Sequence, residues 1–167
     1  MTDGLIDEAT KKAAVAWIAV RDAPALALWC MPLDGALYVV SGPGEQDAPG
    51  LTDAARATVT LRGDHGGRIV TWAATVERIT PGSEAWNTVA PQLAGKRLNA
   101  SGSTENVVAR WAADGCAVVR LSPAGEGEDA RHPGDLPDGS QAAVPRDSPA
   151  RVPVRRPWHL HRVRRRR

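Results

Sequence analysis

Four basic side chains of this sequence could hold a small anion. Lys96 and Arg97 are adjacent cations inside the predicted domain, while Arg62 and Arg68 flank a Gly-rich segment. Ammonium and guanidinium groups bind phosphate and carboxylate oxygens through charge-assisted hydrogen bonds. Two other interpretations stay open, because cations are favourable at the C-terminus of a helix and arginines at strand ends are often only solvated.

A hydroxyl group and an aromatic ring extend this set. Ser41 begins a loop rich in Gly and Pro, which either turns its backbone N–H groups toward an anion or is a plain turn. Trp72 could stack on a flat ring, and it shares a predicted strand with Arg68. Tryptophans at strand or helix spacing more often belong to a core or a dimer interface, and both interpretations apply also to Trp29, Trp86 and Trp111.

The sequence names no catalytic residue and predicts no metal site. It contains neither a Ser/His/Asp arrangement nor a zinc-type cluster. His65 lies in a predicted turn, and the other three histidines lie after residue 130. Cys30 and Cys116 sit in apolar segments without a CxxC partner, so we expect both to be buried, reduced and inert.

The composition indicates one folded domain. The chain has 167 residues, of which 43% are hydrophobic, enough for a packed core. No apolar run approaches the roughly 18–20 residues of a membrane helix, and the first residues lack a signal-peptide pattern, so we expect a cytoplasmic protein. Arginine greatly outnumbers lysine and alanine is abundant, a bias typical of high-GC bacterial genomes.

The charges are distributed unevenly along the chain. Residues 151–167 contain eight arginines and no acid, whereas residues 1–150 contain 13 basic and 19 acidic residues. From residue 123 onward no apolar periodicity remains, so we predict that residues 123–167 form a disordered tail. Its basic end is either a solvated extension or a weak, non-specific contact for nucleic acid.

Apolar spacing and capping residues predict four helices. The first starts at Thr2-Asp3 and continues through Trp17 until Pro24, and a short one covers residues 51–56. Two more start at Ser83 and Ser103, the former broken or restarted by a proline, Pro91.

Apolar runs predict strands between these helices. Residues 25–31 and 36–41, joined through Asp34-Gly35, indicate a hairpin that is covered on both faces. Residues 57–62 and 68–79 form a second pair, and residues 116–121 a last strand. The long strand 68–79 should serve two parts of a sheet, with one face formed by Val70, Trp72, Ala74 and Val76.

The order and spacing of these elements over residues 5–122 resemble the split barrel of the pyridoxamine 5'-phosphate oxidase-like superfamily. The resemblance is greatest to small actinobacterial branches near the deazaflavin-dependent reductases. It rests on the opening helix with the Asp34-Gly35 hairpin, on the loop that leads to residues 57–61, and on residues 68–77. This last segment resembles the oxidase pattern of an Arg-containing strand that ends in small-x-Val-Glu.

The resemblance implies a mainly β (α+β) fold, a six-stranded antiparallel split β-barrel with flanking helices, over residues 1–122. It implies a homodimer that holds FMN or a deazaflavin coenzyme between its subunits and acts as an oxidoreductase on a small-molecule redox substrate. Arg68 matches a strand arginine that often faces the cofactor. Ser41 stands where the family often has a hydroxyl that contacts phosphate.

The sequence departs from the family pattern in one respect. No Lys or Arg occurs between Arg21 and Arg56, where the oxidases carry phosphate-binding cations. A true pyridoxamine phosphate oxidase is therefore disfavoured. Two other functions stay open: a non-catalytic module that holds a flavin or haem, and an adaptor that contacts nucleic acid through residues 151–167.

Overall fold

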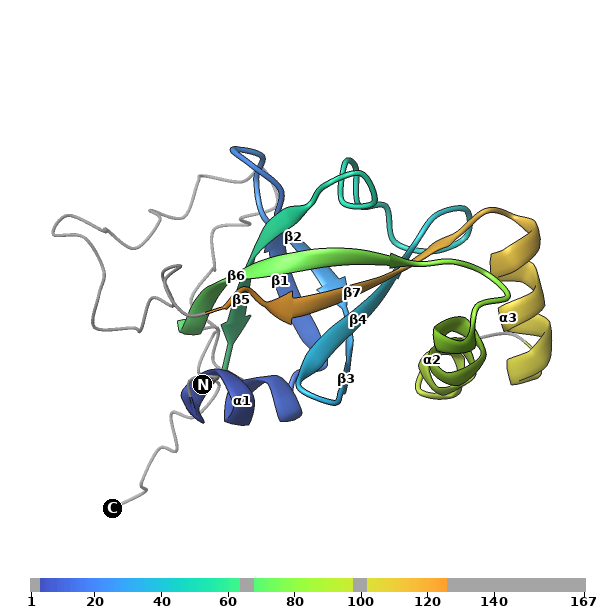
Figure 1. Cartoon of the computed structure of the whole chain (residues 1–167), viewed down its shortest axis with the longest axis horizontal. Helices are drawn as coiled ribbons and strands as arrows, with labels where there is room; N and C mark the ends of the chain where they lie inside the picture. The colour runs from blue at the N-terminus through green and yellow to red at the C-terminus, as the bar shows by residue number, and fades with distance from the viewer. Residues whose placement is uncertain (1–3, 64–67, 98–101, 126–167) are drawn as a thin grey trace, which may run out of the picture. The chain divides into compact units, whose positions relative to one another are not determined.

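The computed structural model describes residues 4–63, 68–97 and 102–125, and the statements below concern these residues. They form three helices and seven strands (Figure 1). In chain order these are α1 (Gly4–Lys11), β1 (Val15–Ala19), β2 (Leu26–Trp29), β3 (Met31–Leu33), β4 (Ala36–Ser41), β5 (Arg56–Arg62), β6 (Arg68–Ile79), α2 (Glu84–Gly95), α3 (Thr104–Ala113) and β7 (Ala117–Pro123). No helix of the described part is long and apolar enough to cross a membrane.

The strands form one antiparallel sheet that curls into a nearly closed barrel. Their order is β2-β1-β5-β6-β7-β4-β3, so β2 and β3 lie at the two edges. These edge strands follow each other in the chain with only Cys30 between them. The Gln46 side chain covers part of the β2 edge, because its amide accepts from the Trp29 N–H at 2.7 Å and donates to the Ala27 carbonyl at 3.1 Å.

The predicted split-barrel class is confirmed, with seven strands in place of six. The first helix is shorter than predicted: it ends at Lys11, and residues 15–19 form strand β1. In β1 the side chains of Ala16 and Ile18 are buried and alternate with more exposed neighbours. Pairing with both β2 and β5 stabilises this segment as a strand, which an isolated helical turn cannot match.

Three further sequence predictions differ from the structure. Residues 51–53 form turns, and Arg56 already belongs to β5, so the short helix at 51–56 is absent. The predicted strand 25–31 is divided at Cys30 into β2 and β3. Helix α2 continues through Pro91, whose ring lies on the exposed side while Val89, Ala90, Leu93 and Ala94 hold the opposite side against the core.

Other elements lie where the sequence places them. The hairpin of β3 and β4 turns at Asp34 and Gly35, whose φ angles of 49° and 72° are those of a type I′ turn. All six residues of β4 are buried, as expected for a strand covered on both faces. The side chains of Ser83 and Ser103 cap α2 and α3 by accepting from backbone N–H groups three residues later.

Strand β6 has the bounds and the division that its sequence predicts. Residues 68–75 pair with β5, and residues 74–79 pair with β7. Val70, Trp72 and Ala74 are buried inside the barrel, whereas Ile79 belongs to a second core outside it. The strand therefore connects the two cores.

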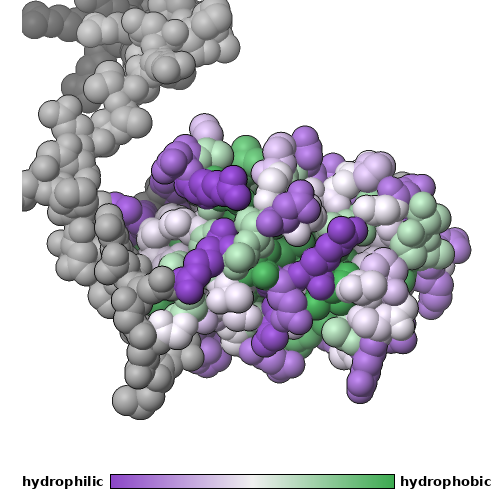
Figure 2. Space-filling view, turned by 45° about the horizontal axis from the view of Figure 1, so that its top comes forward, coloured by the Kyte–Doolittle hydropathy of each residue, from purple (hydrophilic) through white to green (hydrophobic). Residues whose placement is uncertain are grey.

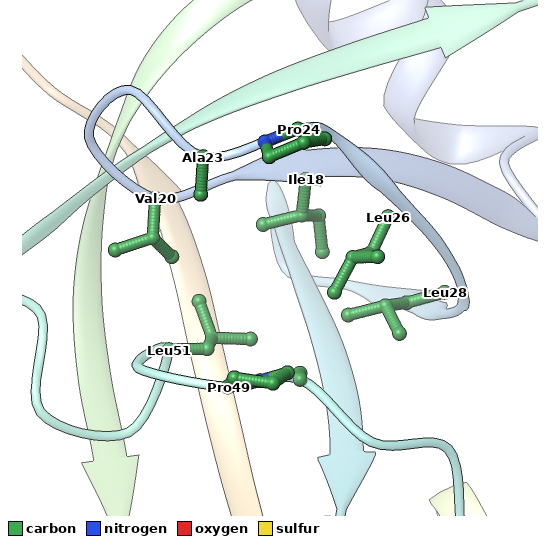
Figure 3. A pocket seen from close by; sticks show the side chains of 9 residues that line it. Ile18, Val20, Ala23, Pro24, Leu26, Leu28, Pro49 and Leu51 are labelled. Atoms are coloured by element: carbon green, nitrogen blue, oxygen red, sulfur yellow. The ribbon is translucent and has the colours of Figure 1, made fainter.

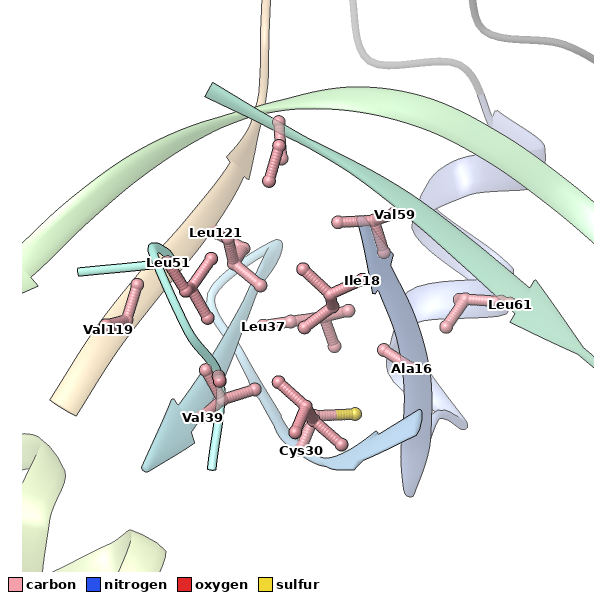
Figure 4. Packing of buried hydrophobic residues seen from close by; sticks show 14 of the residues in the cluster. Ala16, Ile18, Cys30, Leu37, Val39, Leu51, Val59, Leu61, Val119 and Leu121 are labelled. Carbon is pink, nitrogen blue, oxygen red and sulfur yellow. The ribbon is translucent and has the colours of Figure 1, made fainter. Parts of the chain in front are cut away.

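The barrel interior is the first core, filled mainly by aliphatic side chains from every strand except β3 (Figure 4). Ile6 of α1 also belongs to this core. The second core lies between the outer side of β3, β4 and β7 and the helices α2 and α3. Trp86 and Trp111 are buried there. Cys30 and Cys116 are free and buried, as predicted, one in each core.

One carboxylate joins the helices to the barrel. Glu45, in the loop after β4, has a side chain only 2% exposed, and it forms ion pairs with Arg97 after α2 and with Arg110 of α3. The Arg110 Nη2 lies 2.7 Å from Glu45 Oε1 and the Trp111 Nε1 donates to the same oxygen at 2.8 Å. Arg110 also donates to the carbonyl of Pro43 at 3.4 Å.

The two innermost tryptophans differ in the partner of the indole N–H. Trp111 is 0% exposed and donates to Glu45, whereas Trp72 is 2% exposed and its Nε1 has no acceptor among the described residues. A buried N–H without an acceptor destabilises the folded state, and a buried acceptor that loses its donor does the same. The two indoles therefore contribute differently to stability.

We predict that Trp111→Phe is more destabilising than Trp72→Phe by about 1–3 kcal/mol, because only the first substitution removes a hydrogen bond and only the second removes an unpaired donor. Both substitutions leave a similar gap, so each serves as the control for the other. Urea unfolding followed by circular dichroism gives the two free energies of unfolding. Equal losses would contradict the assignment of the indole partners.

Glu45→Gln should lower the free energy of unfolding by about 2–4 kcal/mol, because two guanidinium groups lose their counter-charge at a mostly buried site. The matched control is Glu77→Gln. Glu77 is 59% exposed and pairs with Arg120 at 3.3 Å across the strands, so its loss should cost at most about 1 kcal/mol. A smaller effect at Glu45 than at Glu77 would disprove the role of this carboxylate.

Candidate functional site

The outward-facing side of β1, β5 and the part of β6 that pairs with β5 (residues 68–75), here called the outer face, contributes no side chain to the second core with α2 and α3. Helix α1 places Ile6 in the barrel core, and α2 and α3 pack in the second core. Cross-strand pairing puts Trp17, Thr60 and Thr71 in one row across the three strands. The next row contains Ala19, Thr58 and Ala73.

Side chains on the outer face are small, hydroxylated, aromatic or basic. The Arg62 guanidinium lies over the Trp17 ring, 4.9 Å from its centroid. The hydroxyls of Thr60 and Thr71 are hydrogen-bonded to each other at 2.9 Å. Strands β1, β2 and β5 contain no acidic residue, whereas β5 begins and ends with an arginine. The face therefore combines positive charge with an aromatic surface.

Figure 2 shows one side of the domain, on which hydrophilic side chains stand apart from one another with hydrophobic surface between them. Guanidinium groups and indole rings both bind flat aromatic rings, and guanidinium adds attraction for negative charge. The outer face is therefore suited chemically to a flat, anionic ring compound.

The structure brings Arg62 and Arg68 together. They are cross-strand partners at the end of the β5–β6 ladder, beyond a register shift at Leu61/Arg62. Arg68 is half-buried and Arg62 is exposed. Both arginines can thus contribute charge to the same end of the barrel wall.

Trp72 lies in a different place from the one expected for a ring-binding residue. It is 2% exposed and points into the barrel among Val59, Val70 and Ala74. Alternation along β6 explains this, because the side chains of residues 70, 72 and 74 all face inward. Its ring is therefore a core element, and the accessible tryptophan of this region is Trp17.

Ser41 is buried at the end of β4, 7% exposed, on the side of the barrel where β4 pairs with the start of β7. Its Oγ accepts a hydrogen bond from the backbone N–H of Ala48 at 3.0 Å. In the described chain this hydroxyl thus fixes the loop that follows β4. A contact between Ser41 and a phosphate remains a prediction.

Lys96 and Arg97 lie at the C-terminal end of α2, apart in the fold from the outer face. Lys96 caps the helix and is exposed, and the Arg97 guanidinium lies against the Glu45 carboxylate. Burial, followed by repulsion from Arg110, lowers the pKa of Arg97 from its usual value. In the described structure Arg97 therefore holds the loop after β4, and anion binding by this pair remains a prediction.

Neither thiol is poised for nucleophilic chemistry. Burial raises the pKa of Cys30 to about 12. Burial also raises the pKa of Cys116, although Arg110 and Arg97 oppose this shift, and its Sγ donates to the carbonyl of Pro43 at 3.4 Å. Within residues 4–63, 68–97 and 102–125 no three His, Cys, Asp or Glu side chains group as metal ligands do.

An apolar hollow lies at the end of the barrel opposite Arg62 and Arg68, between the turn after β1 and the loop before β5 (Figure 3). Hydrocarbon side chains line it, among them Ile18, Leu26, Leu28 and Leu51. Its enclosed volume is about 20 Å³. Ligand sites for drug-sized molecules measure about 300–1,000 Å³, so the hollow is too small for a three-ring cofactor.

Sequence reasoning missed Trp17 and Glu45. It placed Trp17 on a helix, although the alternation of Val15 to Ala19 fits a half-buried strand equally well. It placed Glu45 in a loop by composition, and no local pattern signals that a loop carboxylate will meet arginines more than 50 residues later. His65 and the C-terminal segment 126–167 lie outside the described residues.

The sequence matches no protein-family model and no curated protein. Solved structures, in contrast, share its fold at low identity. The haem storage protein HutZ of Vibrio cholerae superposes with a TM-score of 0.53 at 16% identity, over 75% of this chain and 91% of HutZ. A conserved hypothetical protein of Mycobacterium tuberculosis gives 0.54 at 15% identity, over 85% of this chain and 92% of its own.

A third structure, the FAD and haem binding protein of Mycobacterium smegmatis, has a TM-score of 0.50 at 17% identity, over 83% of this chain and 74% of that protein. Identities this low establish the architecture. The chain therefore shares the overall fold of these three structures, and the sheet described above is a split barrel.

Proposed function

We propose that this protein binds a flavin or deazaflavin coenzyme on the outer face of the barrel and uses it in a redox reaction. A second copy of the chain covers the bound coenzyme. The single observation that carries the proposal is the chemistry of the outer face. It joins an accessible Trp17, the Arg62 guanidinium stacked on it and a row of hydroxyls. Strands β1 and β5 and residues 68–75 of β6 contain no carboxylate, whereas Glu77 lies farther along β6.

A flavin fits this chemistry better than haem does. An iron porphyrin is normally held by an axial His, Cys, Met or Tyr. The described residues include no histidine, and their Cys30, Cys116, Met31 and Tyr38 side chains are all at most 7% exposed. The HutZ likeness keeps haem as the alternative cofactor, with the ligand outside the described residues.

The coenzyme would supply the hydride or electron transfer. The chain's own residues bind and orient it: Arg62 and Arg68 offer positive charge at the edge of the face, and the paired Thr60 and Thr71 offer hydroxyls. No side-chain acid or base is needed for these roles. The absence of a catalytic motif in the sequence is thus compatible with an oxidoreductase and with a non-catalytic binding module.

The outer face also supports the proposed homodimer. An apolar and aromatic sheet surface on a chain of this size is normally covered. Exposed apolar residues lie along its border, with Val15 at 48% and Leu26 at 40%. A second copy would exclude water from the coenzyme while leaving the interior of each barrel unchanged.

Equilibrium titration of the purified full-length protein tests the proposal. We expect FMN, FAD or a deazaflavin coenzyme to bind with a dissociation constant below ~100 µM, which corresponds to about −5.5 kcal/mol. Haem in the same assay is the comparison ligand. Failure of all three ring compounds to bind at this level would remove the proposed function, and binding of haem alone would replace it by the haem module.

A negative charge introduced by substitution at the centre of the outer face tests the proposed dimer. Thr60→Glu should convert the dimer to monomer in analytical ultracentrifugation, because dimerisation would have to remove a carboxylate from water. Thr80→Glu, the same substitution in an exposed turn before α2, is the matched control. A wild-type monomer, or a Thr60→Glu variant that still dimerises, would show that this face is not the interface.

A further inference from the structure

Trp17 stands among small neighbours on the outer face. Its cross-strand partners are Ala27 of β2 on one side and Thr60 of β5 on the other. Ala19, two residues along the strand, is also small, and Trp17 itself is half-buried. A large aromatic ring with small neighbours leaves flat surface beside it.

Arg62 completes this surface. Its guanidinium lies 4.9 Å from the centroid of the Trp17 ring, within the range of a cation–π contact. A planar guanidinium stacks on aromatic rings as well as attracting anions, which lysine cannot do in the same way. The indole thus holds a planar cation in place at the surface.

We propose that Trp17 and Arg62 form the stacking platform for the ring system of the bound coenzyme. This inference rests on the proposed function and assigns the ring to one pair of residues. The charge of the platform and the lack of carboxylates on β1, β2 and β5 favour a planar ring that is neutral or anionic over a cationic one. The phosphate or other tail of the coenzyme would lie elsewhere.

Riboflavin and FMN are the probes, since they share the ring and differ by the phosphate. Trp17→Leu should weaken the binding of both by about tenfold, the effect of removing one aromatic stacking partner. Arg62→Lys should weaken both by at least about threefold, because lysine keeps the charge and loses the planar contact. Trp72→Phe, inside the barrel, is the control and should change neither affinity.

Fluorescence of the bound flavin gives an independent readout. A nearby indole quenches an excited flavin by donating an electron that then returns, so emission of the bound probe should be low in the wild type and recover in Trp17→Leu. Trp17→Phe should keep the affinity within about threefold, since phenylalanine still offers a ring face, yet should also restore emission. Thermal unfolding of each variant verifies that it is folded.

The outcomes separate this inference from the proposed function. If the wild type binds no flavin, the proposed function fails and the platform with it. If flavin binds with unchanged affinity and emission in Trp17→Leu, only the platform is wrong. If Arg62→Lys loses affinity for FMN but not for riboflavin, Arg62 is a phosphate contact. If Trp17→Leu becomes a monomer and also loses flavin binding, Trp17 is an interface residue. Either result overturns the platform.

Discussion

The fold depends on the buried carboxylate of Glu45. Its two oxygens meet Arg97, Arg110 and the indole N–H of Trp111, so a loop after β4 is tied to the end of α2 and to α3. A buried carboxylate is stable only when cations and hydrogen-bond donors compensate the loss of its hydration. This arrangement fixes the helices on one side of the barrel. The outer face lies on another part of the barrel wall, formed by β1, β5 and the first part of β6.

Much of the fold could be predicted because its signals are local. The Asp34-Gly35 turn, the serine caps and the alternation along residues 68–79 each report their own structure. Residues 15–19 were misassigned because their apolar spacing fits a helix and a strand alike, and only pairing with β2 and β5 decides between them. The predicted break of the helix at Pro91 was wrong for a similar reason, because the packing of α2 outweighs one missing backbone hydrogen bond.

The site was harder to predict than the fold. Arg62 and Arg68 could be selected as candidates because both flank a turn, and the ladder does place them side by side. Trp72 was a reasonable candidate by type, but strand alternation turns it inward. The residue that takes its place, Trp17, comes from a strand the sequence did not reveal. The contacts of Arg97 with Glu45 depend on segments far apart in the chain.

The two edge strands of the sheet, β2 and β3, follow each other in the chain, and this affects how the barrel can open. Only Cys30, a buried residue, separates β2 from β3 in the chain. The chain therefore passes directly from one edge of the sheet to the other at the seam of the barrel. Along β2, the Gln46 amide forms hydrogen bonds to the strand backbone that a neighbouring strand would otherwise form. Opening of the seam would therefore break the two Gln46 hydrogen bonds and no strand pairing, but it would expose Leu28 and Cys30 of the barrel core.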